Sequence, residues 1–149
     1  MLEHRNVKIT SAICALLLVV AGCATQNVPD ISSYQLASGH TIDPMVETPI
    51  GKPAGTIVVK RDPGLMGAGL SSILLVDGKP MVRLKPGEYI EFRAAPGEHI
   101  FGVSWSDNLG PAATSSTREL AVDVRAGQTY YLRLFPQPGS GIAIERSSR

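Results

Sequence analysis

Few residues in this chain could support acid-base or metal chemistry. His99 is the side chain best placed for proton transfer, and a Ser-His-Asp arrangement can be drawn from it with Asp107 and a nearby serine. The only other histidine after residue 22 is His40, which excludes a site built from several histidines. No nucleophile-elbow sequence surrounds any candidate serine, namely Ser104, Ser106, Ser115 and Ser116. We therefore predict that the protein is not an enzyme, with no catalytic residue, metal site or cofactor, and expect His99 to cap the core with one hydrogen-bonded ring nitrogen.

A glycine-rich stretch over residues 62–69, with Gly64, Gly67 and Gly69, has the composition of a phosphate-binding loop. Such loops bind an anion because the N-terminus of a helix follows and aims its amides at the phosphate. Residues 70–76 have the pattern of a strand instead. We interpret residues 62–69 as a connection between strands.

The thiol of Cys23 is the strongest chemical signal in the sequence. It follows a start that contains Arg5 and Lys8, and an uncharged segment over residues 9–20. A helix over residues 9–22 would span only about 21 Å of a hydrocarbon layer about 30 Å thick, too little for a permanent span. The alternative, an uncleaved membrane helix continuing to residue 27, meets three polar residues and then a proline. We expect residues 1–22 to be a leader that is removed.

The run Val20-Ala21-Gly22-Cys23 resembles the lipobox of bacterial lipoproteins. The resemblance implies cleavage between Gly22 and Cys23 and attachment of lipid to the Cys23 thiol. Proteins of that class carry three acyl chains, enough for stable membrane anchoring. Residue 24 is Ala rather than the Asp that tends to retain such proteins in the inner membrane. The expected location is the bacterial envelope, on the periplasmic face of the outer membrane.

Charge and cysteine content limit the partners of the remaining chain. The leader holds Arg5, Lys8 and Glu3, so the 14 basic and 13 acidic residues of the whole chain become 12 of each. A balanced domain has no electrostatic reason to bind nucleic acid. Cys14 lies in the leader and Cys23 carries the lipid, which leaves no cysteine for a disulfide or a thiolate metal site.

The chain after Cys23 divides into a tether and a domain. Residues 23–55 contain four prolines and no periodic apolar face, a composition typical of a flexible tether, although residues 31–36 could dock on the domain instead. Residues 56–149 contain short apolar runs separated by Gly and Pro. Strands are expected at residues 57–61, 73–76, 81–84, 90–93, 99–105, 120–124 and 130–135, with a short edge strand around Ile142 and Ile144. These predict an all-β, antiparallel sandwich of about seven to eight short strands, immunoglobulin- or transthyretin-like and close in size to an immunoglobulin domain.

Alternation along residues 99–105 predicts which side chains form the core. His99, Phe101, Val103 and Trp105 share one face of the strand. Trp105 is therefore expected to be buried with Phe101 and Val103.

The turns between these strands form an ordered pattern: Asp77-Gly78-Lys79, Pro86-Gly87-Glu88-Tyr89, Pro96-Gly97-Glu98-His99 and Ala126-Gly127-Gln128-Thr129-Tyr130-Tyr131. The pattern resembles a family of bacterial lipoproteins with a shared domain of unknown function, over about residues 56–135. The element Pro96-Gly97-Glu98-His99, between two expected strands, is also similar to PEGA-type and carboxypeptidase-regulatory-type sandwiches. The resemblance implies an accessory sandwich with no catalytic residues.

The loop at residues 106–117, which begins with Ser106, Asp107 and Asn108, is the candidate interaction loop, because it is long and lacks apolar periodicity. The favoured function is a non-enzymatic lipoprotein that binds an envelope protein or the cell wall through loops or a sheet edge. The alternatives are a structural surface-coating lipoprotein and a periplasmic hydrolase.

Overall fold

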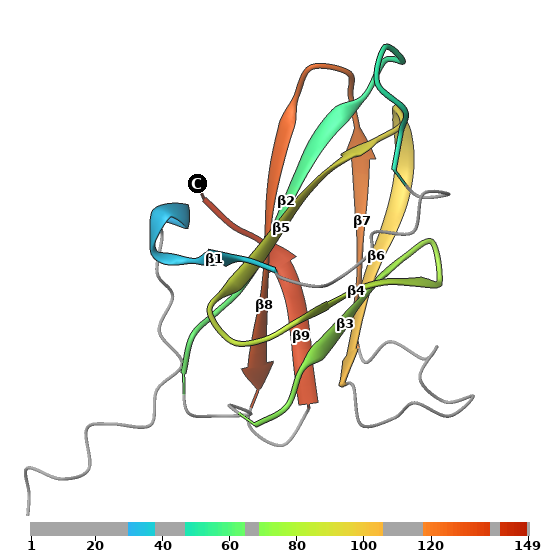
Figure 1. The fold of residues 1–149 in the computed structure, drawn as a ribbon. Helices are drawn as coiled ribbons and strands as arrows, with labels where there is room; N and C mark the ends of the chain where they lie inside the picture. The colour runs from blue at the N-terminus through green and yellow to red at the C-terminus, as the bar shows by residue number, and fades with distance from the viewer. Residues whose placement is uncertain (1–29, 38–46, 65–68, 106–117, 138–140, 149) are drawn as a thin grey trace, which may run out of the picture.

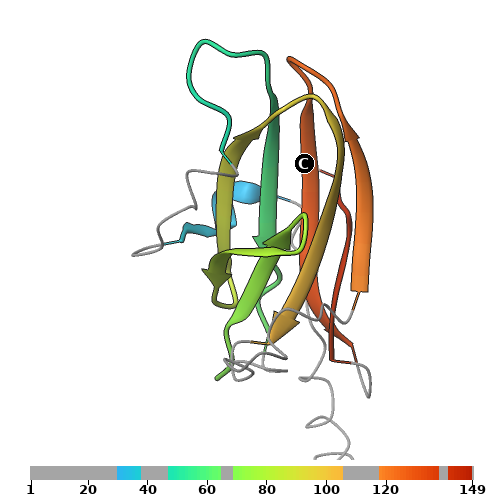
Figure 2. The ribbon, with the colours of Figure 1, turned by 90° about the vertical axis from the view of Figure 1, so that its right-hand side faces the viewer.

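The described residues form two β-sheets packed as a sandwich, in a computed structural model that describes residues 30–37, 47–64, 69–105, 118–137 and 141–148 (Figure 1). One sheet has the strand order β1-β5-β2-β8-β9 and the other β4-β3-β6-β7. Figure 2 shows the two layers from the side. The strands are β1 (Gln35–Leu36), β2 (Gly55–Arg61), β3 (Ser72–Val76), β4 (Lys79–Leu84), β5 (Glu88–Ala94), β6 (Gly97–Trp105), β7 (Arg118–Val124), β8 (Thr129–Gln137) and β9 (Gly141–Arg146).

The all-β sandwich predicted from the sequence is confirmed. Each of the eight expected strands is present, and β1 is an additional one. On β6, Phe101 and Val103 are fully buried as predicted and Ile100 on the opposite face is 37% exposed, but Ser104, expected on the same face as Ile100, is only 2% exposed. Trp105, the last described residue before position 118, is only partly buried and packs against the edge of the core. Its position at the end of β6 accounts for the lower burial.

The predicted turns form with the expected backbone geometry. Asp77 and Gly78 adopt φ values of 51° and 75°, which a tight hairpin between β3 and β4 requires. Gly87 and Gly127 have positive φ at the turns before β5 and β8. These glycines fix where consecutive strands reverse direction.

Two pairings depart from the purely antiparallel arrangement. β2 pairs with β5 antiparallel, but its other neighbour, β8, runs parallel to it, from Thr56 opposite Thr129 to Arg61 opposite Leu134. β1 is also parallel to β5. Parallel neighbours need a long crossover, and here the chain between β2 and β8 passes through the second sheet. The pattern of turns describes only consecutive strands, so it could not predict this pairing.

Part of the predicted tether lies on the domain. Residues 30–37, which we call the strap, contain a short 3-10 helix (Ile31–Ser33) and β1. Gln35 donates its backbone N–H to the carbonyl of Gly87, and Ala37 does the same to Tyr89. Tyr34 is only 6% exposed. Residues 31–36 are therefore docked on the domain and are not part of a flexible tether. The edge of β5 pairs with β1, and Tyr34 is buried.

Candidate functional site

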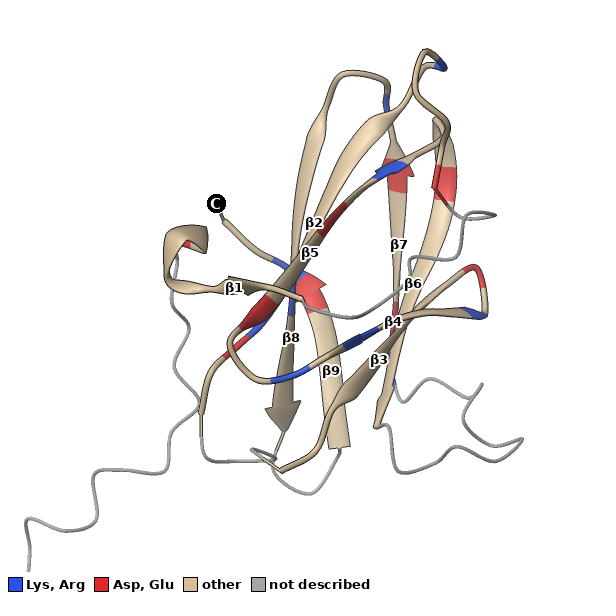
Figure 3. Cartoon of the chain, viewed as in Figure 1, with Lys and Arg blue, Asp and Glu red and all other residues tan. Residues whose placement is uncertain are grey.

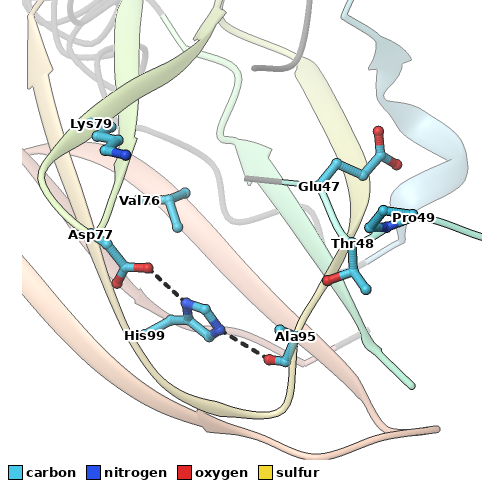
Figure 4. Close-up of a pocket in the computed structure, with 8 residues that line it drawn as sticks. All are labelled: Glu47, Thr48, Pro49, Val76, Asp77, Lys79, Ala95 and His99. Atoms are coloured by element: carbon cyan, nitrogen blue, oxygen red, sulfur yellow. Dashed lines mark hydrogen bonds and ion pairs between the residues drawn. The ribbon is translucent and has the colours of Figure 1, made fainter. Parts of the chain in front are cut away.

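A groove of about 320 Å³ with charged residues in its lining opens beside the β3–β4 hairpin (Figure 4). It lies between that hairpin, the turn that joins β5 to β6, and a segment at residues 47–49 that precedes β2. We call it the hairpin groove. Its lining residues are Glu47, Thr48, Pro49, Val76, Asp77, Lys79, Ala95 and His99.

Asp77 and His99 form the floor of the hairpin groove. His99 Nδ1 lies 2.8 Å from Asp77 Oδ2, and His99 Nε2 lies 2.9 Å from the carbonyl oxygen of Ala95. The Ile100 backbone N–H donates to Asp77 Oδ1 at 2.8 Å. Both partners of the imidazole ring are acceptors, so both bonds form together only when the two ring nitrogens each carry a proton. The ring is thus held by two contacts, rather than the single one expected, and has no free nitrogen to act as a base.

The electrostatics of Asp77 agree with this arrangement. Partial burial acts to raise the pKa of Asp77, but the hydrogen bonds from Ile100 and His99, with the charges of His99 and Lys79, outweigh it and lower the pKa. Asp77 is therefore ionised at neutral pH, and its two oxygens contact the His99 ring and the Ile100 amide. The pair ties the β3–β4 hairpin to the β5–β6 turn.

The wall at residues 47–49 is held in place by Arg93 of β5. Its guanidinium donates to the carbonyl oxygens of Pro49 at 2.8 Å, Thr48 at 3.3 Å and Lys52 at 2.7 Å. In return, the Thr48 N–H donates to the Arg93 carbonyl at 2.8 Å. Residues 49–52 form a tight turn, closed by the Lys52 N–H on the Pro49 carbonyl, with a φ of 88° at Gly51. Arg93 therefore fixes the shape of the groove without lining it.

Replacing His99 with Gln tests the structural role of the Asp77–His99 pair. We expect the free energy of unfolding to fall by about 1–3 kcal/mol, because an amide cannot keep both contacts of the ring. Chemical denaturation measures this, with Glu98→Gln as the control at an exposed neighbouring residue. The envelope phenotype should follow the amount of folded protein. Normal stability with the full phenotype of a deletion would instead indicate a catalytic His99.

A second cluster of charged groups lies under the strap. The Tyr34 hydroxyl donates to Asp62 Oδ1 at 3.2 Å, and Asp62 is 2% exposed. Arg133 Nη1 is 3.7 Å from Asp62 Oδ2, and the Lys60 ammonium lies 5.5 Å from the centre of the Tyr34 ring. Burial raises the pKa of Asp62, although Arg133, the Tyr34 hydroxyl and Lys60 oppose the rise. The cluster joins the strap to the sheet, so we assign it a structural role.

Tyr34→Phe should destabilise the protein by about 1–3 kcal/mol at pH 7, because it removes a donor from a buried carboxylate. The folded-state pKa of Asp62 lies above its usual 3.8, so the native state holds this proton more tightly than the unfolded state does. As the pH falls through the folded-state pKa, Asp62 becomes protonated and the free-energy cost of burying an ionised carboxylate disappears. Without the hydroxyl, the pKa of Asp62 rises further. The difference in the free energy of unfolding between Tyr34→Phe and the wild type should therefore decrease as the pH is lowered toward 4.

The matched control is Tyr131→Phe, since the Tyr131 hydroxyl makes no hydrogen bond within the described ranges. Denaturation curves at several pH values test the expectation. A destabilisation that is the same at pH 7 and pH 4 would show that the Tyr34 hydroxyl does not act through Asp62.

The residues singled out from the sequence fall mostly outside the described part of the chain. Gly22, Cys23, His40 and the loop of Ser106, Asp107 and Asn108 all lie there. Within the described residues, no three His, Cys, Asp or Glu side chains come together as a metal site would require. In the same ranges, no helix is long and apolar enough to cross a membrane.

Sequence reasoning identified the Asp77-Gly78 turn and His99 but not their contact, and it missed Glu47, Thr48 and Arg93. The tight turn at residues 49–52 was a usable signal, because Pro-Ile-Gly-Lys has Gly at the position that needs a positive φ. No protein-family model matches the chain, and no curated protein matches it in sequence.

Proposed function

We propose that the protein is a lipid-anchored component of the bacterial envelope, held by acylated Cys23 on the periplasmic face of the outer membrane. Its sandwich is a non-enzymatic module that binds another envelope component, a protein or the cell wall. The support for the anchor is the lipobox-like run before Cys23. The support for binding is the hairpin groove.

The observation that carries the binding function is the combination of a rigid floor and rigid wall around a groove of about 320 Å³. Binding sites are concave and largely pre-formed, with a few polar groups in fixed positions. Here the Asp77–His99 pair fixes one side and the Arg93 guanidinium fixes the other. Because both His99 nitrogens are already hydrogen-bonded, this geometry favours binding over acid-base catalysis.

The outer strands of the four-stranded sheet, β4 and β7, argue against binding by addition of a strand at those edges. β4 is the outer strand of its sheet and begins with Lys79 and Pro80, two residue types that discourage pairing with another chain. β7, at the opposite edge, carries exposed Arg118, Glu119 and Asp123. The groove is therefore a better candidate than either of these edges.

The distribution of charge supports a partner other than nucleic acid. β2 and β4 carry only basic residues, whereas β5, β7 and β9 carry residues of both signs (Figure 3), and the chain after residue 22 holds 12 basic and 12 acidic residues. Nucleic-acid binding requires a continuous basic surface.

The docked strap would keep the module close to the membrane. Only six residues separate Cys23 from Asp30, the first residue of the strap. A fully extended chain over that interval reaches at most about 25 Å. A tether that ran free to residue 55 would allow a much longer reach. The proposed binding groove is thus held near the lipid surface.

Affinity capture from detergent-solubilised envelope tests the proposed function. Full-length lipidated protein should recover a reproducible, stoichiometric partner, and Lys79→Glu, which reverses a charge at the groove, should lose it. Lys85→Glu is the matched control, because Lys85 is exposed and does not line the groove. Equal recovery with Lys79→Glu, or no partner with the wild type, would contradict binding through the groove. The second outcome favours a surface-coating role.

A further inference from the structure

We propose that the strap is a releasable latch, which sets how far the sandwich reaches from the membrane. With the strap docked, the first described residue held on the sandwich after Cys23 is Asp30. Release would move this point to Thr48, the next described residue with a hydrogen bond to the sandwich. The effect on reach rests on the proposed lipid anchor at Cys23, whereas release depends only on the contacts of the strap.

The strap is bound along an edge, with little of it buried. Gln35 and Ala37 each donate a backbone N–H to the edge formed by β5 and the turn before it, at 2.9 and 2.8 Å. Tyr34 is the only buried residue of the strap, and Leu36 of β1 is 59% exposed. A segment with few buried side chains and exposed backbone bonds opens at a lower free energy than the core. The strap can therefore leave while the two sheets stay packed.

The site under Tyr34 favours release as well, because it is charged. The Tyr34 hydroxyl donates to Asp62 at 3.2 Å, and the ring lies 5.5 Å from the Lys60 ammonium. With the strap docked, Lys60 and Asp62 are 1% and 2% exposed. Burial lowers the pKa of Lys60 and raises that of Asp62, so keeping both groups charged in this site costs free energy. Water can solvate both groups when Tyr34 leaves, which offsets part of the lost contacts.

A second segment on the same edge of β5 is held more firmly. Thr48 donates its N–H to the Arg93 carbonyl, and the Arg93 guanidinium donates to the carbonyls of Thr48, Pro49 and Lys52. β1 pairs with the first residues of β5, whereas residues 47–52 lie at its far end (Figure 1). This segment is expected to stay in place when the strap opens.

Release would lengthen the connection between the anchor and the sandwich. Six residues separate Cys23 from Asp30, and 24 separate Cys23 from Thr48. For flexible chains of these lengths, the mean end-to-end distance rises from about 15 Å to about 28 Å. The attachment point also moves along β5 to the wall of the hairpin groove, which Thr48 lines. The latch therefore controls both the reach and the point of attachment.

Hydrogen exchange of the full-length chain in detergent micelles, followed by nuclear magnetic resonance, tests the release. The amides of Gln35 and Ala37 should exchange at least about 100-fold faster than that of Val59 in the central strand β2. The Thr48 amide, which bonds on the same edge, is the internal control and should exchange at least about tenfold more slowly than the strap.

A core substitution separates local opening from global unfolding. Val122→Ala leaves a cavity in β7 of the other sheet, so exchange at Val59 should rise by at least about tenfold. Exchange at Gln35 and Ala37 should change by less than about twofold, because the cavity destabilises the docked and released states equally. A rise by the same factor at all three amides would show that the strap opens only when the sandwich unfolds.

Substitutions in the strap test what holds it. Tyr34→Ala should raise exchange at Gln35 and Ala37 by at least about tenfold, since it removes the buried side chain. Leu36→Ala is the matched control at an exposed position and should change exchange by less than about twofold. Equal effects of the two substitutions would contradict Tyr34 as the contact that keeps the latch closed.

The reach is tested by energy transfer from Trp105, the one tryptophan of the chain, to an acceptor on lipid headgroups of vesicles that carry the lipidated protein. Leu36→Cys with Tyr89→Cys locks the strap when oxidised, because these residues face each other on β1 and β5. Tyr34→Asp releases it, since a second carboxylate would meet Asp62. Transfer, normalised to vesicles without acceptor, should be lower for Tyr34→Asp than for the locked protein.

The outcomes separate the latch from the anchor. A strap that exchanges as slowly as Val59 overturns the latch, whether or not the chain is lipidated. Fast exchange of the strap with equal energy transfer from the locked and Tyr34→Asp proteins overturns the effect on reach. Failure of the full-length chain to stay on vesicles contradicts the proposed anchor, and with it the effect on reach, while the exchange result still decides the release.

Discussion

Arg61→Ala is expected to lower the free energy of unfolding by about 3–5 kcal/mol, close to the whole stability of a marginal domain, because the guanidinium is fully buried. It donates to the carbonyl oxygens of Leu70 at 2.6 Å and Leu84 at 2.8 Å, which connects the end of β2 to the start of β3 and the end of β4. The substitution leaves two carbonyls without this donor and opens a cavity. Chemical denaturation followed by circular dichroism measures the change.

The charge of Arg61 is retained in spite of its burial. Desolvation lowers its pKa to about 10, while Glu88 acts to raise it, so the side chain stays cationic at neutral pH. Its guanidinium also lies 5.2 Å from the centre of the ring of Trp105, the one tryptophan of the chain. Tryptophan fluorescence should therefore report the loss of Arg61 directly.

Two substitutions separate the buried hydrogen bonds from a general effect of charge. Arg125→Ala removes an exposed guanidinium that pairs with Asp123 at 3.3 Å, and should change stability by less than about 0.5 kcal/mol. Arg61→Lys keeps the positive charge but not the planar fork, so it should recover only part of the lost stability. An Arg61→Ala protein as stable as Arg125→Ala would show that the two carbonyl contacts contribute little.

Strands such as β5 and β7 could be predicted because they have a buried and an exposed face, whereas β3, buried along its whole length, could be predicted from its continuous apolar run. Phe101 and Val103 point into the core while Ile100 faces outward, and this alternation is visible in the residue types alone. The hairpin before β4 was predictable for a similar local reason, since Asp77 and Gly78 tolerate positive φ. Local residue preferences thus determined element positions and turns.

The buried charges were not predictable, because their partners are distant in the sequence. Asp62 meets the hydroxyl of Tyr34, 28 residues earlier, and Arg61 meets carbonyls 9 and 23 residues later. Nothing near Lys60 and Arg61 distinguishes them from an ordinary polar strand end. The docking of the strap was not predictable for the same reason. Its composition resembles that of a linker, and its docking depends on the open edge of β5, which is distant in the sequence.

The candidate site contains residues that the sequence identified and long-range contacts that it could not predict. His99 was noticed as a residue type, and its role as a hydrogen-bonded structural group is consistent with the two contacts of its ring. Its contact with Asp77 spans 22 residues, and the contacts of Arg93 with the wall at residues 48–52 span more than 40. A groove formed by three separate segments is invisible to any reading of local pattern. Its chemistry emerges only when the two sheets are packed.

The second large effect is expected from Cys23→Ser, which should abolish lipid attachment and leader cleavage together. The thiol is the proposed attachment point, a serine hydroxyl cannot replace it, and cleavage depends on prior lipidation in the proteins that this region resembles. Incorporation of radiolabelled palmitate should fall to background, and the variant should migrate as a chain longer by residues 1–22. The variant would carry no acyl chain, so its attachment to the membrane should be lost almost completely.

Cys14→Ser is the matched control, since Cys14 is the other cysteine of the chain and lies inside the expected leader. It should leave labelling and migration unchanged, because the leader is removed with it. A Cys23→Ser protein that still takes up palmitate and migrates as the shorter form would contradict the lipobox interpretation. The position of the strap near the membrane would then lose its physical basis, since that argument depends on an anchor only a few residues before Asp30.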